Sequence, residues 1–128
     1  MKKNLMRVGA GLPALLFIVM GLRWLVDPAG ISGQFGLQYG GGLGGSSLVG
    51  DFGAFFLTLG LCLLLGLVTH NRLWFYPPIM LLLFAATGRV ISWLLHDAAF
   101  AGQMIAFEVI VSLIILAVVK WYPESSSA

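Results

Sequence analysis

The chain has 128 residues, of which 59% are hydrophobic and only 9% are charged, and its mean hydropathy is +0.99. A water-soluble domain usually carries about 25% charged residues. The low charge and the single cysteine exclude an ordinary cytosolic domain, a disordered chain and a secreted disulfide scaffold. The net charge of +2 is too small to indicate a nucleic-acid-binding protein. The composition therefore predicts an integral membrane protein.

Four stretches are long and apolar enough to cross roughly 30 Å of hydrocarbon as helices. They cover residues 5–26, 48–68, 74–95 and 104–122. Runs such as 61–65 do not alternate in polarity, as the strands of a membrane barrel do. The first stretch follows Met-Lys-Lys as in a signal peptide, but Arg23 and Trp24 stand where a small-residue cleavage site is expected, which predicts an uncleaved helix. We therefore expect an all-α, single-domain bundle of four transmembrane helices over residues 1–128.

The positive side chains predict how this bundle is oriented. The connections 27–47 and 96–103 contain no Lys or Arg. Five of the seven positive residues lie before the first stretch, between the second and third, or at the end of the fourth: Lys2, Lys3, Arg7, Arg72 and Lys120. Because cytoplasmic loops are enriched in Lys and Arg, we expect both termini to be cytoplasmic.

Start and stop signals predict a short helix after the first span. Asp27 is a good N-cap residue, Pro28 suits the first helical position, and Gly36 suits the position after the last turn. The expected helix covers residues 28–35, and three of the side chains on or beside it are expected to rest on the outer membrane interface: Ile31, Phe35 and Leu37. The glycine-rich run 40–45 predicts a flexible connection, with a re-entrant segment or a substrate lid as the alternative.

Small residues recur every four positions in two of the predicted spans. In the second span they are Gly50, Ala54, Thr58, Cys62 and Gly66, and in the third they are Ala85, Gly88 and Ser92. Such spacing aligns small side chains on one helix face, where they allow close approach of another helix in lipid. The stripes predict packing within the monomer or, alternatively, against a second copy or a partner helix.

Each span contributes one charge to the outer third of the membrane. The four residues, about 5–9 Å from the outer ends of their helices, are Arg23, Asp51, Arg89 and Glu108. His96 and Asp97 follow just above them, and Trp93 is one turn from Arg89, within reach of a cation–π contact. A charge at the membrane centre costs about 2.5–3.5 kcal/mol, so Arg89 is expected to pair with Asp51 or Glu108.

This charge cluster has two interpretations. One is a salt-bridge network that fixes the register of the helices. The other is a polar pocket open to the outer side, in which Arg89 holds a lipid headgroup, a carboxylate or a phosphate, and Asp51 or Glu108 acts as a base. No catalytic residue, metal site or cofactor is predicted, and a bound lipid belongs only to the pocket interpretation. The two histidines, His70 and His96, fall on opposite sides of the membrane and cannot share a metal ion.

Three motifs resemble those of a known family. They are Gly50-Asp51-Phe52-Gly53-Ala54-Phe55-Phe56, Gly88-Arg89-Val90-Ile91-Ser92, and Trp24-Leu25-Val26-Asp27-Pro28 ahead of Phe35-Gly36-Leu37. Together they resemble a family of small bacterial four-helix integral membrane proteins that is classified as a domain of unknown function. The resemblance covers residues 8–122 and implies the four-helix topology and a bacterial cytoplasmic (inner) membrane. It draws attention to Asp51 and Arg89 and implies no activity. The long glycine run departs from the family's pattern.

These observations leave several functions open. The first is a non-enzymatic membrane subunit that packs through its small-residue stripes into a homo-oligomer or a larger complex. The alternative is a binder or enzyme for a hydrophobic small molecule or lipid whose polar head lies in the charge cluster. Proton-coupled transport through Asp51, Glu108 and Arg89 ranks last, because the inner halves of the helices offer no polar path. The expected partners are the lipid bilayer and either a second copy or a larger membrane complex, and not nucleic acid.

Overall fold

The computed structural model describes residues 2–121 as an all-helical chain without a strand. Its elements are α1 (Lys2–Val26), α2 (Pro28–Ser32), the 3-10 helix η1 (Gly33–Phe35), α3 (Gly42–Thr69), the 3-10 helix η2 (Arg72–Phe75), α4 (Tyr76–Leu95) and α5 (Gly102–Trp121). The four long helices are each long and apolar enough to span a membrane, which confirms the predicted multi-pass helical architecture. Residue 122, the predicted end of the last span, lies outside the described residues.

The second long helix begins earlier than predicted. α3 starts at Gly42 rather than Leu48, so residues 42–45 of the glycine run predicted to be a flexible connection form the first turn of a helix, and Gly40 and Gly41 precede it. Gly41 and Gly42 adopt φ angles of 77° and 62°, which are accessible to glycine at little cost and turn the chain into α3. Gly45 lies against the ring of Tyr39, where an added Cβ would come within 2.9 Å of a ring carbon. These glycines therefore serve a tight turn and a close contact.

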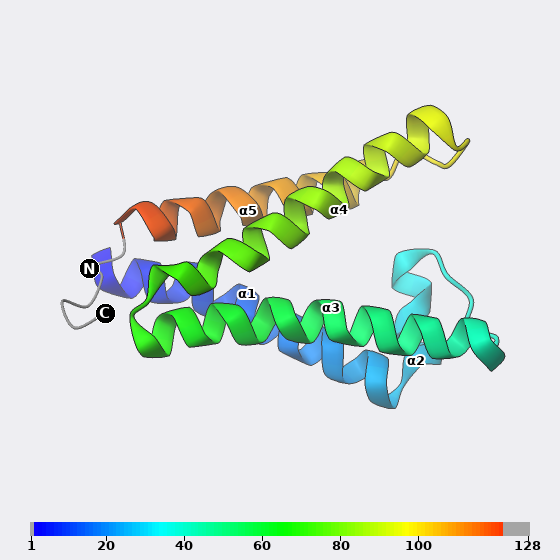
Figure 1. The fold of residues 1–128 in the computed structure, drawn as a ribbon, viewed down its shortest axis with the longest axis horizontal. Helices are drawn as coiled ribbons and strands as arrows, with labels where there is room; N and C mark the ends of the chain where they lie inside the picture. The colour runs from blue at the N-terminus through cyan, green and yellow to red at the C-terminus, as the bar shows by residue number, and fades with distance from the viewer. Residues whose placement is uncertain (1, 122–128) are drawn as a thin grey trace.

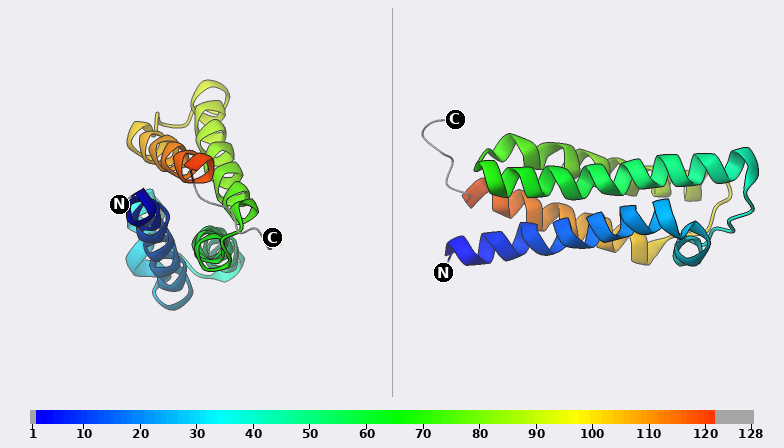
Figure 2. Two further views of the ribbon diagram at one scale, coloured as in Figure 1. Left: turned by 90° about the vertical axis from the view of Figure 1, so that its left-hand side faces the viewer. Right: turned by 90° about the horizontal axis from the view of Figure 1, so that it is seen from below.

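The long helices form two antiparallel pairs. α1 and α3 lie side by side along most of their length, and α4 and α5 form a second hairpin (Figure 1). The pairs meet at the end of the molecule where α1 begins and α5 ends, and they diverge toward the other end, as the end-on view in Figure 2 also shows. We call the divergent end, which carries residues 27–41 and 96–101, the open end.

Glycines bring α1 and α3 into close contact. A Cβ added at Gly60 would lie 2.8 Å from the carbonyl oxygen of Ala14 and from the amide nitrogen of Ile18. A Cβ at Gly21 would lie 2.9 Å from the amide nitrogen of Leu57. Since backbone atoms cannot move aside as flexible side chains do, the two helices can approach this closely only where glycine is present.

The predicted small-residue stripes are only partly used in this packing. Cys62 and Gly66 are buried, and Gly66 lies against the ring of Phe75. The outer members of the stripe on α3 are all exposed: Gly50, Ala54 and Thr58. On α4, Gly88 is exposed, while Ala85 and Ser92 are half-buried. An α-helix has 3.6 residues per turn, so a stripe with a spacing of four drifts around the helix axis and leaves the contact face.

The short helix after α1 forms with the predicted caps. The Asp27 side chain accepts a hydrogen bond from the amide of Gly30 at 3.3 Å, and Gly36 ends η1 with a left-handed φ of 71°. Its apolar side chains do not lie as predicted, however. Ile31 is fully buried, and the ring of Phe35 lies 5.7 Å from that of Trp24. The segment therefore folds back onto α1 and α3, because protein contacts rather than the membrane interface bury these side chains.

Candidate functional site

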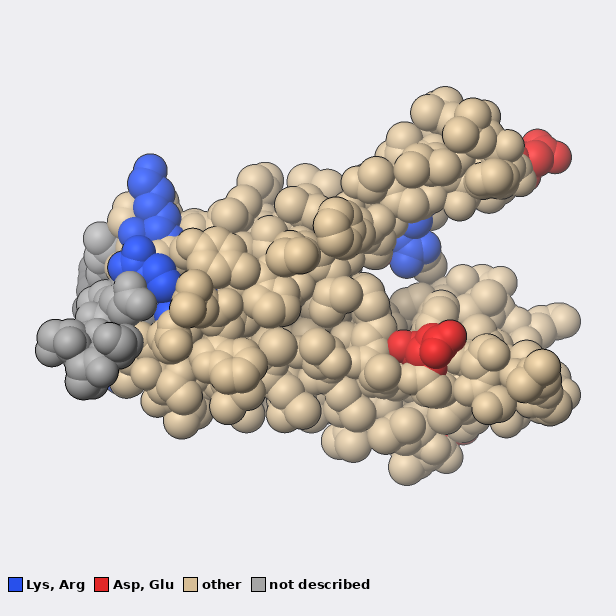
Figure 3. All heavy atoms as spheres, viewed as in Figure 1, with Lys and Arg blue, Asp and Glu red and all other residues tan. Residues whose placement is uncertain are grey.

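A cavity of about 630 Å³ lies between the two helix pairs at the open end. In the space-filling view the surface is hollowed there, between α4 and α3 (Figure 3). Phenylalanine and methionine side chains make up most of the lining, which includes six of the nine phenylalanines of the chain. The lining residues are Phe17, Met20, Gln34, Phe35, Asp51, Phe52, Phe55, Phe56, Leu82, Ala85, Arg89, Gln103, Met104, Phe107 and Glu108.

Arg89 and Glu108 form an ion pair on one wall of this cavity. The Arg89 Nε donates to both carboxylate oxygens of Glu108, at 3.0 Å and 3.1 Å. The Glu108 side chain is 8% exposed and that of Arg89 is 31% exposed. The pairing occurs because α4 and α5 are hairpin neighbours, so their inward faces meet at this depth. Of the two acids considered from the sequence, Glu108 is therefore the one that neutralises Arg89.

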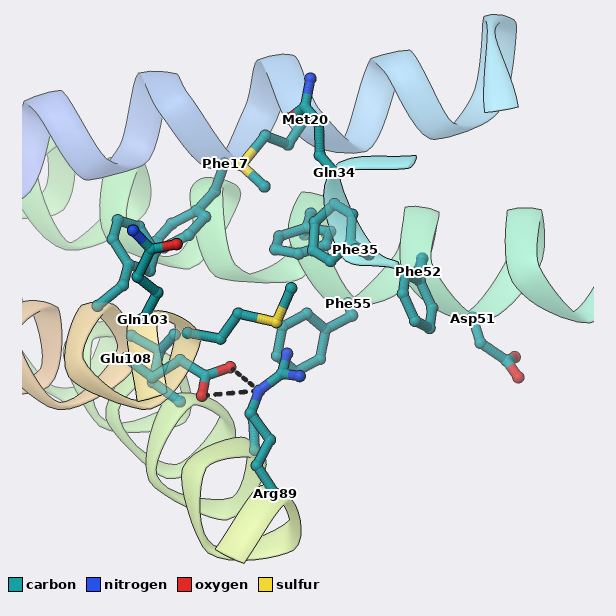
Figure 4. A pocket seen from close by; sticks show the side chains of 15 residues that line it. Phe17, Met20, Gln34, Phe35, Asp51, Phe52, Phe55, Arg89, Gln103 and Glu108 are labelled. Carbon is teal, nitrogen blue, oxygen red and sulfur yellow. Dashed lines mark hydrogen bonds and ion pairs between the residues drawn. The ribbon is translucent and has the colours of Figure 1, made fainter. Parts of the chain in front are cut away.

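The ion pair leaves most of the guanidinium free to bind something else. Arginine has five N–H donors, and the Nε–H is the one that reaches Glu108. The two terminal nitrogens carry the other four N–H groups, and they are turned toward the cavity (Figure 4). Within residues 2–121, no hydrogen bond donated by these two nitrogens is recorded. The cavity thus presents an unused planar donor of the kind that binds carboxylates and phosphates through paired hydrogen bonds.

Asp51 lines the rim of the same cavity from α3 (Figure 4). Asp51 is exposed, and its carboxylate makes no recorded hydrogen bond or ion pair among the described residues. Because α3 begins at Gly42, Asp51 lies nine residues, about 14 Å, below the start of its helix, deeper than the sequence predicted. An unpaired carboxylate on α3 therefore lies at the rim of the cavity and points away from Arg89, whereas the partly free guanidinium on α4 is turned into the cavity (Figure 4).

The structure separates the other predicted members of the charge cluster from this cavity. Arg23 is half-buried near the open end of α1 and does not line the cavity. His96 and Asp97 lie exposed in the turn between α4 and α5. The Trp93 ring packs on Phe100, with 4.8 Å between ring centroids, and no contact between Trp93 and Arg89 is recorded in the described chain. The predicted cluster thus becomes one ion pair and one acid at the rim of the cavity, with four residues outside.

The sequence-based reasoning missed most of the cavity lining. Gln34 and Gln103 supply amide groups from η1 and α5, and neither belongs to a recognisable motif. The sequence placed Phe35 on the short helix and Phe52, Phe55 and Phe56 in a motif of the second span, but it did not predict that their rings line a common cavity. Only the positions of the helix pairs show that these side chains face a cavity rather than lipid.

The arrangement combines apolar walls with the free N–H groups of Arg89, which together could hold an amphiphile. Within residues 2–121, no three His, Cys, Asp or Glu side chains gather closely enough to hold a metal ion.

Comparisons with protein-family models, curated proteins and solved structures gave no match to this chain. The resemblance to the small bacterial membrane-protein family therefore stays a prediction.

Proposed function

We propose that this protein binds a lipid or another hydrophobic small molecule whose acidic group lies against Arg89. The observation that carries the proposal is the guanidinium with four N–H donors turned into an aromatic cavity of about 630 Å³. Binding pockets for small molecules are typically about 300–1,000 Å³, mainly apolar, and equipped with a few placed polar groups. The apolar walls suit hydrocarbon, and the guanidinium suits a carboxylate or a phosphate.

The proposal places this cavity in the outer half of a bacterial cytoplasmic membrane. Lys and Arg gather at the end where α1 begins, opposite the open end (Figure 3). By the positive-inside rule, this distribution favours cytoplasmic termini. The α2–η1 segment then lies near the outer membrane surface and covers the end of the α1–α3 pair.

The energetics of a charge in lipid support a bound acidic group. Guanidinium N–H groups that face mainly apolar walls gain from hydrogen-bond acceptors, and Glu108 pairs only with the Nε of Arg89. An acidic headgroup would supply acceptors for the remaining N–H groups, with its chains against side chains such as Phe52 and Phe55. The phenyl rings then exclude water and strengthen the interaction.

Native mass spectrometry of the full chain, extracted gently from its own membrane, tests this proposal. The wild-type chain is expected to retain a ligand above its mass of 13.8 kDa. The double variant Arg89→Gln/Glu108→Gln removes both charges but keeps polar side chains that hydrogen-bond each other, and it should reduce retention by at least about tenfold. Arg23→Gln is the matched control, because it removes an arginine near the open end but outside the cavity. Equal ligand retention by the folded double variant and the wild type would refute the proposal.

A second candidate function is that of a subunit in a homo-oligomer or a larger membrane complex. It is favoured by the exposed small residues Gly50, Ala54 and Thr58, which form a smooth strip on α3. A Cβ added at Gly50 would meet no atom within 4 Å, so this strip has no partner within the described chain. The test is cross-linking in membranes of Thr58→Cys in a Cys62→Ala chain. Leu64→Cys, exposed on another face of α3, is the control.

The subunit function predicts a covalent dimer for Thr58→Cys but not for Leu64→Cys. A native mass equal to one chain, together with no cross-link at either position, would exclude self-association through the strip. Retention of a lipid by such a monomer would still satisfy the first proposal, so the two functions are separable.

A further inference from the structure

We infer that the bound amphiphile has a zwitterionic head, with its acidic group at Arg89 and an ammonium group at Asp51. This inference rests on the proposed function and deepens it by naming the class of ligand. The head that fits is a phosphate joined to a primary amine, as in an ethanolamine phospholipid. The observation behind it is that one cavity is lined both by a partly free guanidinium, turned inward from α4, and by an unpaired, exposed carboxylate at its rim on α3.

The charge balance of the cavity disfavours a purely anionic ligand. The charges lining it are one Arg and two acids, Asp51 and Glu108, so its formal charge is one negative unit. A singly anionic head would raise this to two negative units, with Glu108 buried and Asp51 exposed at the rim, and like charges repel each other. A zwitterionic head leaves the total unchanged and gives both Arg89 and Asp51 a partner of opposite sign.

The surroundings of Asp51 also suit an ammonium group. Phe52 and Phe55 line the cavity on the same helix and present rings that attract cations. A primary ammonium donates hydrogen bonds to a carboxylate, whereas the methylated ammonium of choline has no N–H to donate. The Asp51 carboxylate therefore favours ethanolamine over choline.

The apolar lining indicates that the head belongs to a lipid rather than to a free solute. The cavity opens between α3 and α4, on a side of the bundle that faces the membrane in the proposed orientation (Figure 3). The face of α4 that points away from the cavity carries exposed apolar side chains such as Phe84 and Ile91, which are compatible with contact to acyl chains. A lipid could thus place its head in the cavity while its chains remain partly in the bilayer.

Lipid competition in nanodiscs tests this inference with the full chain. The discs contain equal amounts of phosphatidylethanolamine, phosphatidylcholine and phosphatidylglycerol with identical acyl chains, and the retained lipids are quantified by native mass spectrometry. The wild type is expected to retain phosphatidylethanolamine over phosphatidylglycerol by about tenfold, which corresponds to one charge-assisted hydrogen bond. Asp51→Asn should abolish most of that preference, because it removes the charge and keeps the shape. Asp97→Asn, exposed in the turn beyond α4, is the matched control and should leave the preference unchanged.

The outcomes separate this inference from the proposed function. An unchanged lipid preference in Asp51→Asn, combined with loss of all lipid in Arg89→Gln/Glu108→Gln, would overturn the zwitterion and leave the binding function standing. A wild-type preference for phosphatidylglycerol or phosphatidylcholine would also overturn it. Lipid retention by the double variant at the wild-type level would overturn the binding function itself. Displacement of the lipid by glycerophosphoethanolamine at the same concentration would refute the assignment to a lipid, since that molecule lacks acyl chains.

Discussion

Removing the two partners of the Arg89–Glu108 pair one at a time is expected to have unequal effects on stability. The Glu108 side chain is 8% exposed, whereas that of Arg89 is 31% exposed and faces the cavity. Arg89→Gln therefore leaves a carboxylate in a site with little access to water. Glu108→Gln leaves a guanidinium that can turn toward water or a headgroup at the open end.

The magnitudes follow from the burial of the group left behind. Breaking a buried ion pair by removing one partner costs about 3–5 kcal/mol, and we expect Arg89→Gln to lie near the low end, at about 3 kcal/mol, because the cavity is open. For Glu108→Gln we expect about 1 kcal/mol, as for a pair whose remaining member is solvated. The double variant should be no less stable than Arg89→Gln, because neither charge is then left without a partner.

The measurement is the free energy of unfolding in mixed micelles, from titration with a denaturing detergent and detection of helix content by circular dichroism. The three variants and the wild type form a double-mutant cycle, in which a coupling energy of about 2 kcal/mol is expected. Equal costs for the two single variants, or a larger cost for Glu108→Gln, would refute the assignment of Glu108 as the buried member. Additive costs would show that the two side chains do not interact in the folded protein in micelles.

Three further predictions concern the fold. Gly60→Ala should destabilise the protein by about 1–3 kcal/mol in the same unfolding assay, since the new methyl group meets the Ala14 carbonyl. Gly50→Ala should be neutral or stabilising, because no atom lies within 4 Å of a Cβ added at Gly50. Equal stabilities would contradict the close approach of α1 and α3. Gly36→Ala should cost about 1 kcal/mol in unfolding free energy, because φ is 71° there, and an unchanged midpoint would argue against that turn. The Cys62 thiol, buried in α3, should resist maleimide until the denaturing detergent unfolds the helices, and fast labelling of the folded protein would contradict its burial.

Local features of the sequence were sufficient to predict much of the fold. Four apolar stretches predict four long helices, because a helix crossing lipid must be apolar over about 20 residues wherever its neighbours lie. Asp27, Pro28 and Gly36 predict the short helix, since capping depends on residues a few positions apart. The glycine run defeated local reasoning, because its low helix propensity is outweighed by a tight turn and by contact between Gly45 and Tyr39.

The candidate site was determined by the sequence only in part. Charges in the apolar stretches identified Arg89, Asp51 and Glu108, because any ionisable group in lipid needs a partner or a function. Which acid meets Arg89, and which glycines lie between the helices, depends on the rotation of each helix about its axis and on the neighbour it faces. The cavity exists because the α4–α5 pair diverges from the α1–α3 pair, which no spacing within a single helix encodes. Only the tertiary structure turned three of the four predicted charges into one ion pair and one carboxylate at the rim of an aromatic cavity, and left Arg23 outside it.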